Sequence, residues 1–285
     1  MTNNQHIEYV KDTFEEYLSK KDHISASDIK SFIKSPRNYY YQKYENKKPK
    51  DIKKHYVVGS AVHEAIMEPH QFHNNYVVSP IFNRRTTIGK EDEAKWIETV
   101  KNKQIIDSDE MEMIKIMGKN ALKNNTLSEL LKDSHREISL YTTDEKTGLK
   151  IRLRPDILCK KFPTIVDIKT TTDSSPQGFK RDVYKFGYSL TDAFYRHFSN
   201  RENYVFCAIE KEAPYQISLF QLGEEMSEYG ENIFRRGLDL LKWSYDNDFW
   251  CDYNEFEILK ECYDLGNPDE FLELNKTANK ISFLK

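Results

Sequence analysis

The sequence has few cysteines, and its four thiols form no Cys-x-x-Cys pair. That spacing argues against a zinc or iron–sulfur site and is typical of reduced thiols, so we expect a cytoplasmic protein. The chain also lacks any apolar run near the ~20 residues that would span a bilayer. Its first residues lack the apolar core of a signal peptide. These absences predict a protein that does not bind a membrane.

An excess of positive charge is also missing, because 43 Lys and Arg residues face 46 Asp and Glu residues and the net charge is −3. The chain therefore has no global signature of nucleic-acid binding. Basic residues nevertheless gather at residues 47–54 and 84–90. Solvated lysine loops explain the first stretch best. The second, Arg84-Arg85-Thr86-Thr87-Ile88-Gly89-Lys90, combines side chains that suit phosphate contact, although it is not a Walker A loop.

The remaining composition predicts a folded α+β protein. Charged residues make up 31% of the chain and aromatic residues 13%, which is unlike a disordered segment. We expect a helical N-terminal third around one mixed sheet, as a single domain over residues 1–249, followed by an acidic tail at 250–285. Apolar spacing predicts helices at 7–18, 58–68, 91–104, 107–132, 187–199 and 224–245, and strands at 137–141, 149–156, 164–169, 204–209 and 216–222.

The segment from Arg154 to Lys169 combines acidic residues with apolar strands. Asp156 ends one apolar run, and Asp167 and Lys169 lie two positions apart on the next. Residues i and i+2 of a strand point to the same face, so the last two side chains should project together. Two carboxylates can hold a hard divalent cation, and a lysine can position a water or stabilise the pentavalent phosphorus. The pattern Pro-Asp…Asp-x-Lys has the form of a PD-(D/E)XK nuclease site.

Asp-x-Lys alone is common, and such a pair is usually a solvated salt bridge worth ~0–1 kcal/mol. The setting is less ordinary here, because Leu158 and the run 164–166 are apolar and partly β-branched, as in buried strands. Burying two acids and a lysine is costly unless they are paired or bind a metal. The surroundings of the motif therefore favour a functional site over a surface ion pair.

A second candidate is His63, which ends the segment Gly59-Ser60-Ala61-Val62-His63. A lone histidine on an apolar helix is more often a satisfied core residue. Small neighbours would let this helix pack closely against a sheet and bring the imidazole near it. A neutral imidazole is a good metal ligand or proton carrier near pH 7. From spacing alone, both interpretations stay open.

In this order the motifs resemble the RecE-type (exonuclease VIII-like) nucleases of phages and prophages, which belong to the PD-(D/E)XK superfamily. The resemblance runs from about Ser25 to Leu241, and although each motif alone is weak, the ordered set is specific. The motifs are Ser25-Ala26-Ser27, Ser35-Pro36-Arg37-Asn38-Tyr39, Gly59-Ser60-Ala61-Val62-His63, Glu68-Pro69 with Phe72, Arg84-Arg85-Thr86 with Gly89-Lys90, Arg154-Pro155-Asp156, Val166-Asp167-Ile168-Lys169-Thr170-Thr171, and Gly187-Tyr188 with Ala193-Phe194-Tyr195.

The resemblance implies roles for residues at matching positions. Lys169 would be the catalytic lysine. One departure is Thr191, which stands where related sequences have a glutamine; it is too short to reach as that amide does, which affects the expected grip on DNA but not the metal ligands. The catalytic metal site, for Mg²⁺ or Mn²⁺, would comprise Asp156, Asp167, His63 and the Ile168 carbonyl, and DNA contacts would come from Arg84, Arg85, Thr86, Lys90, Tyr188 and Tyr195.

The resemblance further implies a phage- or prophage-encoded Mg²⁺-dependent exonuclease, acting in the cytoplasm of a bacterial host. It would degrade linear duplex DNA from its ends, in the 5′→3′ direction, and leave single strands for an annealing protein. Similar proteins form ring-like homo-oligomers, in which an acidic exterior can coexist with a basic channel. Two alternatives remain: an endonuclease that also cuts closed circles, and a DNA-end- or protein-binding module with a repurposed core.

Overall fold

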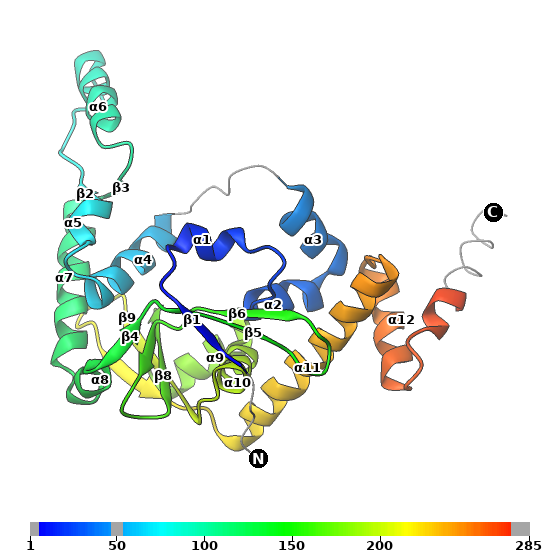
Figure 1. The fold of residues 1–285 in the computed structure, drawn as a ribbon. Helices are drawn as coiled ribbons and strands as arrows, with labels where there is room; N and C mark the ends of the chain where they lie inside the picture. The colour runs from blue at the N-terminus through cyan, green and yellow to red at the C-terminus, as the bar shows by residue number, and fades with distance from the viewer. Residues whose placement is uncertain (1–5, 47–53, 275–285) are drawn as a thin grey trace.

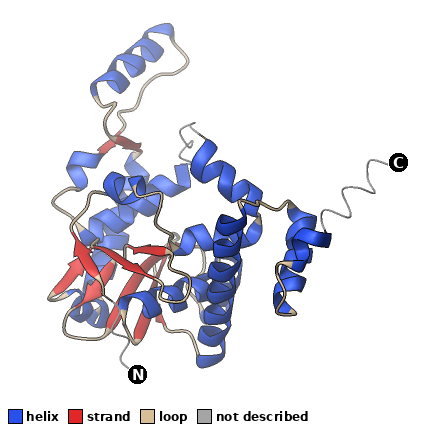
Figure 2. Ribbon diagram, turned by 45° about the vertical axis from the view of Figure 1, so that its right-hand side comes forward, coloured by secondary structure: helices blue, strands red, loops and turns tan. Residues whose placement is uncertain are grey.

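The computed structural model describes residues 6–46 and 54–274 of the chain (Figure 1). Most of the lysine stretch at 47–54 therefore lies outside the described residues. None of the helices in the described part combines the length and the apolar character that crossing a membrane requires. Strands form layered sheets near the centre, helices surround them, and one helical arm stands apart from the body (Figures 1 and 2).

The central sheet has strands in the order β10-β9-β8-β7-β4. β8 and β9 run parallel along their whole lengths, whereas the other neighbouring strands are antiparallel, so the sheet is mixed. β9 is a nearly continuous apolar run, as expected for a strand buried on both faces, whereas the apolar residues of β8 are interrupted by Asp167 and Lys169. The five strands are β4 (Ser134–Arg136), β7 (Ile157–Cys159), β8 (Thr164–Thr171), β9 (Asn203–Glu210) and β10 (Ile217–Phe220).

A second, antiparallel sheet in the order β1-β5-β6 corrects the prediction of one continuous sheet. The helix predicted at 7–18 is wrong in its first half, because its first residues pair with β5. Helix starts only after Thr13, which forms a capping box with Glu16. The strand predicted to reach Asp156 ends at Leu153. The elements are β1 (Glu8–Val10), α1 (Phe14–Ser19), β5 (Ser139–Thr143) and β6 (Lys150–Leu153).

Helices cover both faces of the central sheet. Val166 and Ile168 of β8 are buried in the cluster that includes α4 and α7 residues, while Ile165 lies in the cluster of α2, α10 and α11. Because side chains alternate, Asp167 and Lys169 share the α10 side of β8. The helices are α2 (Ala26–Lys34), α3 (Pro36–Tyr40), the π-helix η1 (Tyr41–Glu45), α4 (Lys54–Met67), α5 (Phe72–Asn75), α7 (Ser108–Lys123), α8 (Asn125–Leu131), α9 (Pro176–Phe186), α10 (Tyr188–Ser199) and α11 (Glu224–Asn247).

The single helix predicted at 107–132 is two helices, because the helical backbone conformation is interrupted at Asn124. The backbone of Asn124 is extended, and its side chain accepts a 3.0 Å hydrogen bond from the Leu127 N–H. Asparagine is a preferred N-cap residue because its short side chain satisfies a free N–H of the first turn. The cap therefore starts α8 in a new direction, which apolar periodicity alone does not reveal.

The segment after residue 250, which shows little periodicity, contains a helix. α12 (Tyr253–Asp264) begins at an Asp252 capping box. Phe256 and Leu259 are fully buried and belong to the same apolar cluster as α2, α10 and α11. These contacts attach the helix to the body, although the segment is rich in acidic residues.

An arm rises from the body between two short parallel strands, β2 (Tyr76–Val78) and β3 (Gln104–Ile106). Its helix, α6 (Thr87–Thr99), stands away from the remaining helices in both views (Figures 1 and 2). The helix predicted at 91–104 begins earlier than expected, because Thr86 caps its start, and it ends earlier, at Thr99. Ile81 and Ile88 are largely exposed on this arm.

The fold depends on close contact between α10 and α11 at Gly230. A Cβ at this position would lie 2.1 Å from the carbonyl oxygen of Ser189. Gly230→Ala should therefore lower the free energy of unfolding by ~1–3 kcal/mol, as overpacking does. Gly118→Ala in α7 is the matched control, because a Cβ at Gly118 would lie 3.7 Å from the Ala65 Cβ, which is an ordinary contact distance. The control should preserve or raise stability. Urea unfolding measures both, and equal values would contradict the packing argument.

Candidate active site

β7 and β8 bring the two predicted acids side by side. Ile157 pairs with Val166 in antiparallel register, so Asp156, just before β7, lies opposite Asp167 on β8. The backbone N–H of Ile168 donates a 2.6 Å hydrogen bond to Asp156 Oδ2. This bond holds the Asp156 carboxylate against β8 although Asp156 itself lies outside regular strand.

Lys169 lies on the same face of β8 as Asp167, with its Nζ 2.5 Å from Asp167 Oδ2. Burial lowers the pKa of Lys169, but the charges of Asp167 and Asp156 outweigh it and leave the pKa above its ordinary value. The ammonium also lies 5.4 Å from the centre of the Tyr188 ring, an arrangement that favours a cation. Lys169 is therefore charged at neutral pH.

The pair of acids is only partly satisfied. Burial and the charge of Asp167 raise the pKa of Asp156 well above its ordinary value, although Lys169 acts in the opposite direction. Asp167 Oδ2 is buried and receives no well-directed hydrogen bond from the residues that the structure describes. Asp167 Oδ2 and Lys169 Nζ therefore form an ion pair whose geometry is unsuitable for a hydrogen bond. A divalent cation would satisfy both carboxylates, because such ions prefer oxygen ligands.

His63 reaches the same place from α4, on the other side of the sheet. Its Nδ1 lies 3.4 Å from Asp156 Oδ2. Burial and the charge of Lys169 lower the pKa of His63 to about 4, although Asp167 and a hydrogen bond with the backbone of Ile168 act against this shift. The contact is therefore made by a neutral imidazole rather than by a charged one. A neutral imidazole is the form that binds a metal.

Glu137 joins this site, although the sequence did not single it out. Ligand atoms of Glu137, His63 and Asp156 lie within 4.8 Å of one another. The Glu137 N–H donates a 3.1 Å hydrogen bond to the Asp156 carbonyl, and its carboxylate pairs with Arg154 at 3.0 Å. These oxygens and one imidazole fit a divalent cation such as Mg²⁺ or Mn²⁺. Glu137 has a φ of 51°, a backbone feature that no sequence pattern reveals.

The residues predicted to grip DNA at the basic loop lie on the arm, away from the acids (Figure 1). Arg84 forms a bidentate ion pair with Glu93, with N–O distances of 2.5–3.0 Å, so its charge is already balanced. Arg85 and Lys90 are exposed. The structure thus offers these two cations to solvent rather than to the acids.

Thr86 and Gly89 have structural roles at the start of α6. The Thr86 hydroxyl accepts a 3.0 Å hydrogen bond from the Gly89 N–H and caps the helix. A Cβ at Gly89 would lie 2.1 Å from the Asn83 carbonyl oxygen. The glycine is therefore explained by the turn that precedes α6, without a phosphate beside it.

The first turns of α10 contain the remaining predicted residues. Tyr188 lies beside Lys169, as described above. The Tyr195 hydroxyl lies 3.5 Å from both the backbone nitrogen and the carbonyl oxygen of Arg154, so it supports the segment that leads to Asp156. The Thr191 hydroxyl accepts a 3.1 Å hydrogen bond from Lys30 of α2. The sequence did not single out Lys30.

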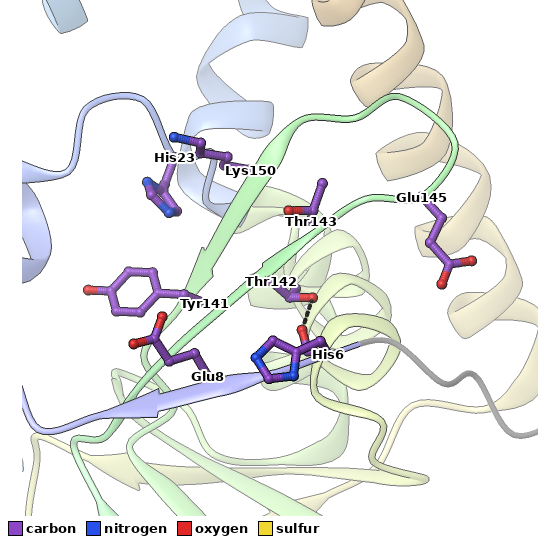
Figure 3. Close-up of a pocket in the computed structure, with 8 residues that line it drawn as sticks. All are labelled: His6, Glu8, His23, Tyr141, Thr142, Thr143, Glu145 and Lys150. Atoms are coloured by element: carbon purple, nitrogen blue, oxygen red, sulfur yellow. Dashed lines mark hydrogen bonds between the residues drawn. The ribbon is translucent and has the colours of Figure 1, made fainter.

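A separate pocket of about 420 Å³ opens beside β1, β5 and β6 (Figure 3). Polar side chains line much of it, including Glu8, Tyr141 and Lys150. Its lining contains neither the acids of β7 and β8 nor His63. We therefore place the candidate active site at the acids and not at this pocket.

Comparisons with known proteins support the fold. A family model described as "PDDEXK-like domain of unknown function (DUF3799)" matches residues 25–261. A crystal structure from Eubacterium rectale named "Putative exonuclease" is similar with a TM-score of 0.55 and 14% identity, covering 80% of this chain and 86% of that one. The crystal structure of SSO0001 matches over 67% of this chain and 87% of that one at 15% identity, but its TM-score of 0.31 is too low to indicate a shared fold. No curated protein matches. The predicted α+β class with helices around a mixed sheet is confirmed.

The site predicts how the protein responds to metal. Asp156→Asn should stabilise the metal-free protein, because it removes a carboxylate whose charged form burial and Asp167 disfavour. It should also abolish the stabilisation by Mn²⁺, which for the wild type reaches ~2.7 kcal/mol at a metal concentration 100 times Kd. Thermal melts with Mn²⁺ and with chelator measure both effects.

The control for this variant is Asp133→Asn. Asp133 is exposed, and its φ of 48° is a conformation that asparagine adopts readily. This variant should respond to Mn²⁺ like the wild type. A wild-type response in Asp156→Asn as well would remove Asp156 from the list of ligands.

Proposed function

This chain belongs to the family of PDDEXK-like domains, and on that premise we propose that it is a divalent-metal-dependent deoxyribonuclease, specifically an exonuclease. The observation that carries the proposal is the meeting of Asp156, Asp167, Lys169 and His63 at one place, although they come from three separate segments. A purely structural ion pair on a strand would not require a histidine from a helix on the opposite face of the sheet. The under-satisfied Asp167 Oδ2 adds to this argument.

Each residue has a role that its geometry supports. Asp156 and Asp167 would hold the cation, with His63 and the Ile168 carbonyl as further ligands. Glu137 could join them, because its carboxylate lies within 4.8 Å of the ligand atoms of His63 and Asp156. When bound, the cation would lower the pKa of a water molecule and offset charge on the phosphate. Lys169 keeps its proton in this setting and can stabilise negative charge that develops on the phosphorus oxygens.

Two observations support the exonuclease over other nucleases. The similar structure from Eubacterium rectale bears the name of an exonuclease, although at 14% identity the likeness concerns the fold. The ordered motifs resemble RecE-type nucleases. On this basis we propose digestion of linear duplex DNA in the 5′→3′ direction, by a ring-like homo-oligomer, to supply single strands to an annealing protein. A restriction- or repair-type endonuclease is the alternative that the next experiment separates.

Purified protein with Mg²⁺ should degrade linear duplex DNA and leave covalently closed circular DNA intact. Chelator should stop the reaction. Lys169→Met should slow turnover of bound DNA by ~10²-fold or more, in the range of one lost transition-state donor. Gel and acid-soluble nucleotide assays measure these rates. Cleavage of circles would establish the endonuclease, and full activity in chelator would refute metal dependence.

The arm is proposed to contact DNA at some distance from Asp156 and Asp167. Arg85→Ala should weaken DNA binding for every sequence and reduce the slope of log K against log salt by ~0.9, the value for one lost duplex phosphate contact. Arg84→Ala should have a smaller effect, because Glu93 already pairs with Arg84. Fluorescence anisotropy at several salt concentrations measures both slopes. Normal affinity in both variants would show that the arm does not contact DNA.

A further inference from the structure

Lys30 reaches the candidate active site from α2. Its ammonium donates hydrogen bonds to the Thr191 hydroxyl at 3.1 Å and to the Phe186 carbonyl at 3.2 Å. Its stem crosses Gly187, where a Cβ would lie 3.2 Å from Lys30 Cδ. Gly187 has a φ of 62° and joins α9 to α10. The corner between these helices is therefore shaped to admit a lysine side chain.

Lys30 differs from the other half-buried lysines in its partners. Lys43 pairs with Asp28 at 3.1 Å, and Lys169 pairs with Asp167 at 2.5 Å. Within residues 6–46 and 54–274, no carboxylate lies within ion-pair distance of Lys30, and only two of its three N–H donors have an acceptor. A half-buried cation held by neutral acceptors alone is costly unless an anion arrives.

The charge of Lys30 is sensitive to its surroundings. Burial and the charge of Lys169 lower the pKa of Lys30 to about 8, although the charge of Asp167 acts in the opposite direction. These effects place Lys30 within electrostatic reach of both β8 residues. The groups that contact its ammonium from α9 and α10 are the uncharged Phe186 carbonyl and Thr191 hydroxyl.

The same face of α10 contacts both lysines. Tyr188 lies beside Lys169, and Thr191, three positions later, accepts from Lys30. Residues three apart on a helix are neighbours on its surface. The two ammonium groups therefore flank one turn of α10, on the side of β8 where Asp167 projects.

We propose that Lys30 is a second active-site cation, which contacts a DNA backbone phosphate next to the one that is cleaved. The proposal rests on the nuclease function proposed above. A compact ammonium with a free donor suits a phosphate oxygen. The short Thr191 side chain matters here, because it accepts one N–H and leaves space for the ammonium to turn toward DNA.

The test compares Lys30→Met, Lys30→Arg and the control Lys34→Met. Methionine keeps the length of the stem and removes the charge, whereas arginine keeps the charge. Lys34 lies on the same helix and is exposed, so its loss should change little. Lys30→Met should lower kcat/KM for linear DNA by ~10- to 100-fold. Its Mn²⁺-induced melting shift should match the wild type, and Lys30→Arg should recover most of the activity.

A pH profile distinguishes a catalytic charge from a structural tether. The charge of Lys30 is present below its pKa and is lost as pH rises through about 8. The kcat/KM of the wild type should therefore fall above that pH, because this ratio reports the free enzyme. Lys30→Arg should stay active there, since arginine remains protonated. Identical alkaline limbs in both proteins would overturn the proposal.

Binding separates this proposal from the nuclease function itself. Duplex DNA affinity is measured in chelator, where no cleavage is expected, at several salt concentrations. Lys30→Met should reduce the slope of log K against log salt by ~0.9, and Lys34→Met should not. If the wild-type protein binds DNA but never cleaves it, the proposed nuclease function is refuted. The salt slope of Lys30→Met then still shows whether Lys30 contacts a phosphate. Equal slopes and equal kcat/KM for Lys30→Met and wild type would reject Lys30.

Discussion

Two carboxylates held side by side in a partly buried place are the constraint on which the rest of the structure depends. Asp156 and Asp167 repel each other, and burial adds to the cost of their charges. The surroundings offset that cost only in part, through Lys169 and the Ile168 N–H. If the sheet had a purely structural role, apolar residues in place of these acids would make it at least as stable. Their presence is therefore best explained by a cation that completes the site.

The topology explains how groups from both faces of the sheet reach one point. β7 is short and begins only at Ile157, so the part of β8 beyond Val166 does not pair with β7 on that edge. His63 of α4 approaches there, while Tyr188 of α10 lies on the opposite side. Gly59 of α4 faces β8, because a Cβ there would lie at an ordinary contact distance of 3.5 Å from Thr170 Oγ1.

The sequence predicted β5, β6, β8, β9 and β10 and the acidic motif because their signals are local, whereas it missed the three-residue strands β1, β2, β3, β4 and β7. The spacing of Asp167 and Lys169 fixes a shared face whatever the rest of the chain does. Glu137 and Lys30 could not be found in this way. The position of Glu137 depends on a left-handed backbone conformation, and that of Lys30 on the corner between two distant helices. The split at Asn124 was missed for a related reason, because a cap competes with periodicity.

The distribution of charge reconciles a net charge of −3 with the polyanionic substrate that we propose. The acids at β7 and β8 would repel a phosphate, so DNA can enter the site only when their charge is offset. Lys169 offsets part of it but is itself paired with Asp167. Binding of the metal and of DNA should therefore favour each other, since each reduces the repulsion that opposes the other. A strongly basic surface is then unnecessary, and a few cations beside the acids are sufficient to direct the backbone.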